Sequence, residues 1–107
     1  MVAPMIDMDR IRELRAEIGE CDLDLVLDLF LVEAEETVCR LEAGGAAVDL
    51  ARATHFLHGG ALNVGLRAFA AVAAEIGAGP ADGAGRAATR LRAVLDSTRE
   101  AVVTLRS

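Results

Sequence analysis

The stretch DLDLVLDLFLVEAEETVCRLEAGG, residues 22–45, carries the longest regular pattern in the chain. Its apolar side chains recur every three or four positions, which is the spacing of one face of an α-helix. They are Leu23, Val26, Leu27, Phe30, Ala34, Val38 and Leu41. Acidic residues fall on the other side, where we expect solvent, at Asp24, Asp28, Glu35 and Glu42. The pattern predicts an amphipathic helix that ends at the pair Gly44-Gly45.

The rest of the chain is organised in the same way. Ile11, Leu14 and Ile18 indicate a short first helix that stops at Gly19, after a mobile lead over residues 1–7. Further helices are expected over residues 47–62 and 66–77, and a last one after a flexible loop at 77–85. The predicted fold is all-α: one domain over residues 1–107, an up-down four-helix bundle with a short additional N-terminal helix.

Composition narrows the function classes. A net charge of −6 and a pI of about 4.8 disfavour nucleic acid as a partner. We find no signal peptide and no apolar run long enough to cross a membrane, so we expect a cytoplasmic protein. Cys21 and Cys39 have no metal-like spacing and are predicted to be free thiols. The four apolar stripes suffice for one core, which predicts a monomer.

The segment THFLHGGALNVG, residues 54–65, places two adjacent glycines inside a predicted helix. This is unusual in an alanine-rich chain, because an interior glycine costs a helix about 1 kcal/mol relative to alanine. On a helical wheel the core direction is set by Leu50, Ala53, Thr54, Leu57, Ala61 and Val64. His55 then lies about 140° from that direction and His58 about 80° from it. Gly59 falls beside His55, whereas Gly60 points elsewhere and is interpreted as a packing glycine.

The surroundings of His55 are consistent with a contact surface. Ala51 and Gly59 leave space around the imidazole, and Leu62 adds an apolar side chain on a face that should be polar. Arg52 supplies a positive charge nearby. Two plainer interpretations stay open at this point: His55 is only a solvated residue, or His55 and His58 form part of a metal site, which two imidazoles leave incomplete.

The residues HFLHGGALNVG resemble the motif of the histidine-containing phosphotransfer (HPt) domain, His-x-Leu-Lys-Gly followed by three variable residues and Asn-x-Gly. The matching positions are His55, Leu57, Gly59, Asn63 and Gly65. The helix over residues 29–44 also resembles the family's second helix. One position departs from the motif: His58 stands where the family has lysine.

The resemblance implies that His55 accepts a phosphoryl group from a receiver-domain phosphoaspartate and passes it to another response regulator, in a relay fed by a hybrid histidine kinase. His58 would supply charge from the family's lysine position, with Arg52 and Arg67 adding a positive rim. Gly59, Leu62, Asn63, Ala51 and Phe30 would contact the partner, and Leu31 is an alternative to Phe30. The protein would be a carrier and not an enzyme, with no cofactor of its own, because Mg²⁺ belongs to the receiver.

Two rival functions stay open. The first is an HPt-like docking module that binds a receiver without accepting phosphate, an interpretation favoured by His58. The second is a plain helical adaptor, for which replacement of His55 would change nothing. The use of arginine without lysine is typical of a GC-rich bacterial genome.

Overall fold

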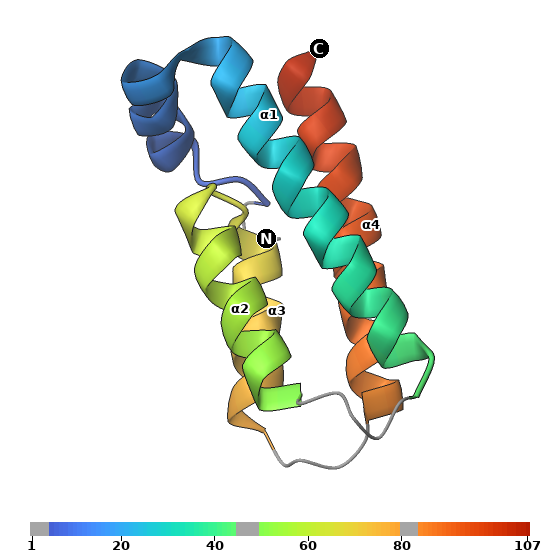
Figure 1. Ribbon diagram of the computed structural model, residues 1–107. Coiled ribbons are helices and arrows are strands. Elements are labelled where there is room, and N and C mark those ends of the chain that lie inside the picture. Colours follow the sequence, from blue (N-terminus) through green and yellow to red (C-terminus); the bar gives the residue numbers. More distant parts are fainter. Residues whose placement is uncertain (1–4, 45–49, 80–83) are drawn as a thin grey trace.

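The computed structural model describes residues 5–44, 50–79 and 84–107, and within them the chain forms four helices and no strand (Figure 1). They are α1 (Met8–Glu42), α2 (Leu50–Asn63), α3 (Arg67–Ala78) and α4 (Ala84–Arg106). The all-helical bundle is as predicted. The linker between α3 and α4 is shorter than predicted: α3 continues to Ala78 and α4 begins at Ala84, so part of the loop predicted at 77–85 is helical. Residues 45–49 and 80–83 lie outside the described residues.

The helices associate mainly as two antiparallel pairs. Figure 1 shows α2 beside α3 and α1 beside α4, and contacts of α3 with α4 and of α1 with α2 close the bundle. The core consists of the apolar stripes of all four helices; its largest fully buried side chains include Leu27, Leu57, Phe69, Leu91 and Leu95. The predicted core side of α2 is largely confirmed, since Thr54, Leu57, Ala61 and Val64 are all buried.

The predicted separate N-terminal helix is not confirmed as an element of its own, because its residues form the first turns of α1. The chain leaves helical geometry at Gly19, where φ is 85° and ψ is 166°. A positive φ is readily adopted by glycine alone, which explains why the change of direction falls there. Figure 1 shows the first turns bent away from the rest of α1 and lying over the end of α2.

Hydrogen bonds hold this N-terminal segment on the turn between α2 and α3. The Asp7 amide donates to the Gly65 carbonyl at 2.8 Å. The Arg10 guanidinium donates from Nε to the Asn63 carbonyl at 2.9 Å and from Nη2 to Asn63 Oδ1 at 3.1 Å. Ile11, fully buried, packs beneath. Residues 5–7 of the predicted lead are therefore held in place, and residues 1–4 lie outside the described residues.

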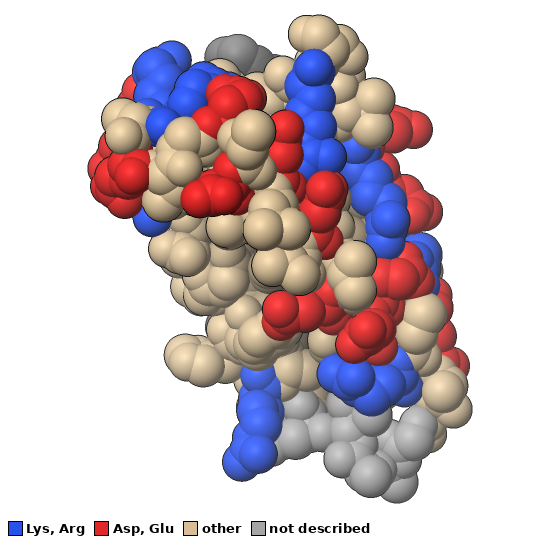
Figure 2. All heavy atoms as spheres, turned by 45° about the horizontal axis from the view of Figure 1, so that its top comes forward, with Lys and Arg blue, Asp and Glu red and all other residues tan. Residues whose placement is uncertain are grey.

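Salt bridges join α1 to α4, and they correct the expectation that the acidic side of α1 faces only solvent. The Glu35 carboxylate accepts hydrogen bonds from both terminal nitrogens of Arg92, at 2.7 and 2.8 Å, and from Nη2 of Arg99 at 2.7 Å. Arg106 bonds Asp28 at 2.8 Å. Figure 2 shows basic and acidic side chains interleaved on this side of the molecule. The acidic positions that the periodicity assigned to solvent therefore serve as a second, polar contact between helices.

The Glu35 cluster predicts an acid-sensitive contribution to stability. Hydrogen bonds from Arg92 and then Cys39 lower the pKa of Glu35 from 4.5 to about 2. A carboxyl whose pKa is depressed on folding stabilises the fold above its unfolded pKa and loses that contribution as the pH falls from about 4.5 to about 2. We expect Glu35→Gln to cost about 1 kcal/mol at pH 7, because the site is partly exposed.

Urea unfolding at several pH values between 7 and 2 measures this difference. The difference in the free energy of unfolding between wild type and Glu35→Gln should become smaller as the pH falls from about 4.5 to about 2. Glu36→Gln is the matched control, since Glu36 is the neighbouring exposed carboxylate and should show no such narrowing. An unchanged gap from pH 7 to pH 2 would show that the Glu35 cluster does not stabilise the fold in its charged form.

Candidate functional site

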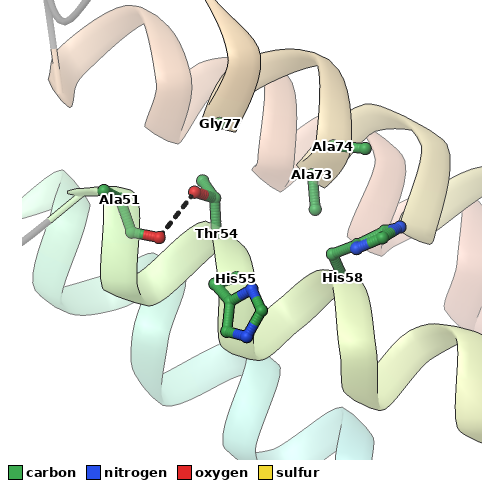
Figure 3. A pocket seen from close by; sticks show the side chains of 7 residues that line it. All are labelled: Ala51, Thr54, His55, His58, Ala73, Ala74 and Gly77. Atoms are coloured by element: carbon green, nitrogen blue, oxygen red, sulfur yellow. Dashed lines mark hydrogen bonds between the residues drawn. The ribbon is translucent and has the colours of Figure 1, made fainter.

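His55 lies in the middle of α2 with its side chain exposed, on the outer face of the helix, as the wheel predicted. His58, one turn later, is half-buried. In Figure 3 the His58 ring reaches toward α3 beside Ala73 and Ala74, whereas the His55 ring lies on the near face of α2. The two imidazoles therefore stand at one site, one open to solvent and one against the neighbouring helix.

A pocket of about 300 Å³ lies between α2 and α3 at these histidines (Figure 3). Small residues make up most of its wall, and its lining consists of Ala51, Thr54, His55, His58, Ala73, Ala74 and Gly77. The Thr54 hydroxyl lies 2.9 Å from the Leu50 carbonyl and 3.1 Å from that of Ala51, to which it donates. Since Thr54 is committed to its own helix, the imidazoles are the polar side chains that this pocket offers to a ligand or partner.

The glycine pair divides into two roles. A Cβ atom placed on Gly59 would meet nothing within 4 Å, so this glycine leaves open space beside His55. A Cβ on Gly60 would stand 2.7 Å from Cε1 of Phe30, which is too close for the ring to stay where it is. Gly60 thus lets α1 approach α2, and the interpretation of Gly60 as a packing glycine agrees with this contact.

Phe30 is a correction to the predicted contact surface. Its side chain is only 7% exposed and meets Phe69 edge-on, with ring centroids 5.7 Å apart. Leu31, the predicted alternative, is 9% exposed. Both were predicted partner contacts from the neighbouring helix, although Phe30 also belongs to the apolar stripe of its helix, and the structure places both on the core side of α1. Phe30 supports α2 from beneath and is not presented to a partner.

The other predicted contact residues lie at the surface to different degrees. Leu62 is 53% exposed on the same helix as His55, and Ala51 lines the pocket. Arg52 is exposed on α2, and Arg67 is exposed at the start of α3, and neither lines the pocket. Asn63 is exposed, but its carbonyl and side-chain oxygens already accept from Arg10. The predicted partner contact of Asn63 therefore competes with a contact inside the chain.

The turn after α2 uses the glycine that the sequence placed there. Gly65 has φ 77°, and a Cβ on it would lie 3.2 Å from Cδ1 of Ile11 and 3.3 Å from the carbonyl oxygen of Asp7. Both the backbone conformation and the space thus favour glycine. The Asn-x-Gly part of the motif is consequently where the N-terminal segment meets the α2–α3 turn.

Sequence reasoning missed two parts of the site. Phe56 is 44% exposed next to His55, and its position about 120° from the core direction of the wheel would have indicated this. The wall formed by α3 was also missed, although Ala73 lies in the helix predicted over residues 66–77, which was expected to close at Gly77. A Cβ on Gly77 would stand 2.9 Å from Thr54 Oγ1. This close approach of α3 to α2 is a tertiary contact, and the wheel of a single helix does not contain it.

Within the described residues, no group of three or more His, Cys, Asp or Glu side chains is arranged to hold a metal ion. Cys21 and Cys39 are both exposed and unbridged. No helix among the described residues is both long and apolar enough to span a bilayer.

Comparison with known proteins supports the motif. The family model described as "Hpt domain" matches residues 25–101, a range that holds α2, α3 and both histidines. Comparison with curated proteins and with solved structures gave no significant match. Hpt domains are histidine-containing phosphotransfer modules of two-component signalling that interact with receiver domains and kinases and act as carriers, not as classical enzymes. Because the match covers most of the chain and agrees with the helical bundle, this protein belongs to the Hpt domain family.

Proposed function

We propose that this protein is a phosphorelay carrier whose phosphoacceptor is His55. The observation that carries the proposal is the position of His55: its imidazole is exposed in the middle of α2, and the next turn presents Gly59, with open space where a side chain would stand. A receiver domain carries its phosphoaspartate in a recessed acidic site, so an acceptor must project without obstruction. Family membership supplies the chemistry, and the open surface supports the choice of this histidine.

The transfer step is a displacement at phosphorus. A ring nitrogen of His55 attacks the phosphoryl group of the donor aspartate, an N–P bond forms, and the acyl phosphate O–P bond breaks to release the carboxylate. A second receiver reverses the step and takes the phosphoryl group onto its own aspartate. Mg²⁺ is expected on the receiver, so the carrier contributes the nucleophile, the shape of its surface and nearby positive charge.

The residues around His55 would share the remaining work. Leu62, exposed and apolar, provides contact area to the receiver. The small side chain of Ala51 leaves the His55 ring accessible to it. His58 lines the pocket of His55 and occupies the position of the family's lysine. Arg52 is exposed on α2 and Arg67 at the start of α3, and their positive charges would attract the acidic pocket of a receiver. A hybrid histidine kinase would be the ultimate donor, in a bacterial cytoplasm.

A second candidate function is an Hpt-like docking module that binds a receiver without accepting phosphate. The observation in its favour is the replacement of lysine by His58, which carries a full charge only when protonated. In both candidate functions, the receiver domain binds the face of α2 that carries His55.

Incubation with a panel of phosphorylated receiver domains separates them. The carrier predicts acid-labile label on wild type and on His58→Gln and none on His55→Gln. Binding to a receiver under transfer conditions without any label on wild type would favour the docking module. Absence of both label and binding across a broad panel would contradict both.

A further inference from the structure

Two imidazoles share one pocket that is otherwise built from small and apolar groups. Of the seven lining residues, only His55, His58 and Thr54 bear polar side-chain atoms, and the Thr54 hydroxyl donates within α2. A negative charge placed on His55 would therefore find one partner among the lining side chains, the ring of His58. That ring is half-buried against α3, which limits the water available to screen the interaction.

The charged groups on the helices around the pocket lie away from His58. On α3 the lining residues are uncharged, and Glu75 bonds Arg90 of α4 at 3.1 Å. Where α1 meets α2, Phe30 lies against Gly60 and Arg10 bonds Asn63, and these two positions are about 200° and about 140° around α2 from His58. On α2 itself, exposed Arg52 lies about 120° around the helix from His58 but about 60° from His55, so its charge is near the phosphoryl group and not near His58. Among the titratable side chains of α2, His55 is thus the one that shares the pocket with His58, about 60° away around the helix.

We propose that protonation of His58 and phosphorylation of His55 are coupled, so that pH sets how strongly the carrier holds its phosphoryl group. The inference rests on the proposed function, because it needs a phosphoryl group on His55. A nearby negative charge favours the protonated form of an imidazole, and imidazoles titrate near neutral pH. Coupling is reciprocal: if the phosphoryl group favours the proton on His58, then that proton favours the phosphoryl group on His55.

A lysine at position 58 would hold its charge throughout this pH range, so the coupling is a property of this chain's histidine. The consequence is directional. As the pH falls and His58 gains its proton, the share of phosphoryl group held by the carrier at equilibrium with a receiver should increase relative to that of His58→Lys. A shift of one pH unit in the titration midpoint corresponds to about a tenfold change in this equilibrium.

The test follows the His58 ring by ¹H–¹⁵N NMR from pH 5.5 to 8.5, before and after phosphorylation with phosphoramidate. This small donor gives its phosphoryl group to an imidazole nitrogen and releases ammonia, so no partner protein is needed. We expect the titration midpoint of His58 to increase by about one pH unit in the phosphorylated protein. His55→Gln, treated identically, should show no change. In a separate equilibration with a phosphorylated receiver domain, the share of phosphoryl group on wild type should rise relative to that on His58→Lys as the pH falls.

The outcomes separate the two claims. If His55 is phosphorylated and the titration midpoint of His58 does not change, the coupling is overturned and the carrier function still stands. Label on His58 in place of His55, or no label on either histidine, overturns the proposed acceptor and the coupling with it. A midpoint that shifts equally in treated His55→Gln would show that the effect does not arise from the phosphoryl group on His55.

Discussion

Replacement of His55 by glutamine should reduce the transfer of label from a phosphorylated receiver to the background of the assay, a loss on the order of 1000-fold or more. Glutamine keeps a polar side chain of similar reach, but its amide nitrogen is not a nucleophile. Because His55 is exposed on the outer face of α2, the substitution should leave the thermal unfolding temperature nearly unchanged. Rapid-quench measurement of labelled carrier against time gives the rate directly.

The matched control is His58→Gln, which removes the other imidazole of the same pocket. It should retain measurable transfer, since it alters charge near the acceptor and not the acceptor itself. Equal loss in the two variants would mean that both rings are required for the step. Full transfer to His55→Gln would show that the phosphoryl group resides elsewhere on the chain.

Substitution of the adjacent glycines by alanine should change stability and transfer in opposite ways. Gly59→Ala should stabilise the fold by about 0.5–1 kcal/mol, because alanine favours the helix and its Cβ meets nothing within 4 Å. The same methyl group stands beside His55 and should hinder the approach of a receiver, which we expect to reduce transfer about tenfold. Stability would thus be gained at the expense of function.

Gly60→Ala should instead lower stability and leave transfer nearly unchanged. Its Cβ would lie 2.7 Å from the Phe30 ring, and that ring is confined by its edge-on contact with Phe69. Overpacking of this kind costs about 1–3 kcal/mol, which exceeds the gain in helix propensity. Transfer measured well below the unfolding temperature should change less than in Gly59→Ala.

Urea unfolding and transfer rates measured on both variants check this pair. If Gly59→Ala transferred as fast as wild type, the open space beside His55 would have no role in docking. If Gly60→Ala were as stable as wild type, the close approach of α1 to α2 would not depend on the missing side chain.

The periodic parts of the fold could be predicted from the sequence, because one buried face per helix leaves a repeating signal. That signal placed Leu27, Leu41 and Leu57 in the core and His55 at the surface, all as observed. The glycine pair could also be divided between its two directions, since adjacent residues of a helix point about 100° apart.

Contacts between distant elements could not be predicted in the same way. The acidic side of α1 looked like a solvated face, because a wheel does not show which helix packs beside it, and Glu35 instead bonds Arg92 and Arg99. Phe30 was predicted to contact a partner although it belongs to the apolar stripe of its own helix, and that stripe is what the bundle buries. The bond from Arg10 to Asn63 joins residues 53 positions apart, and no local pattern in either segment predicts it.

The central claim is that His55 carries the phosphoryl group, and the most direct measurement is to locate that group on the wild-type protein. The carrier would be labelled by its receiver at neutral pH, kept out of acid, and fragmented in a mass spectrometer by a method that preserves N–P bonds. We predict one phosphoryl group per chain, on the imidazole of His55. A group on His58 or another side chain, or an unmodified chain that binds a phosphorylated receiver, would contradict the account.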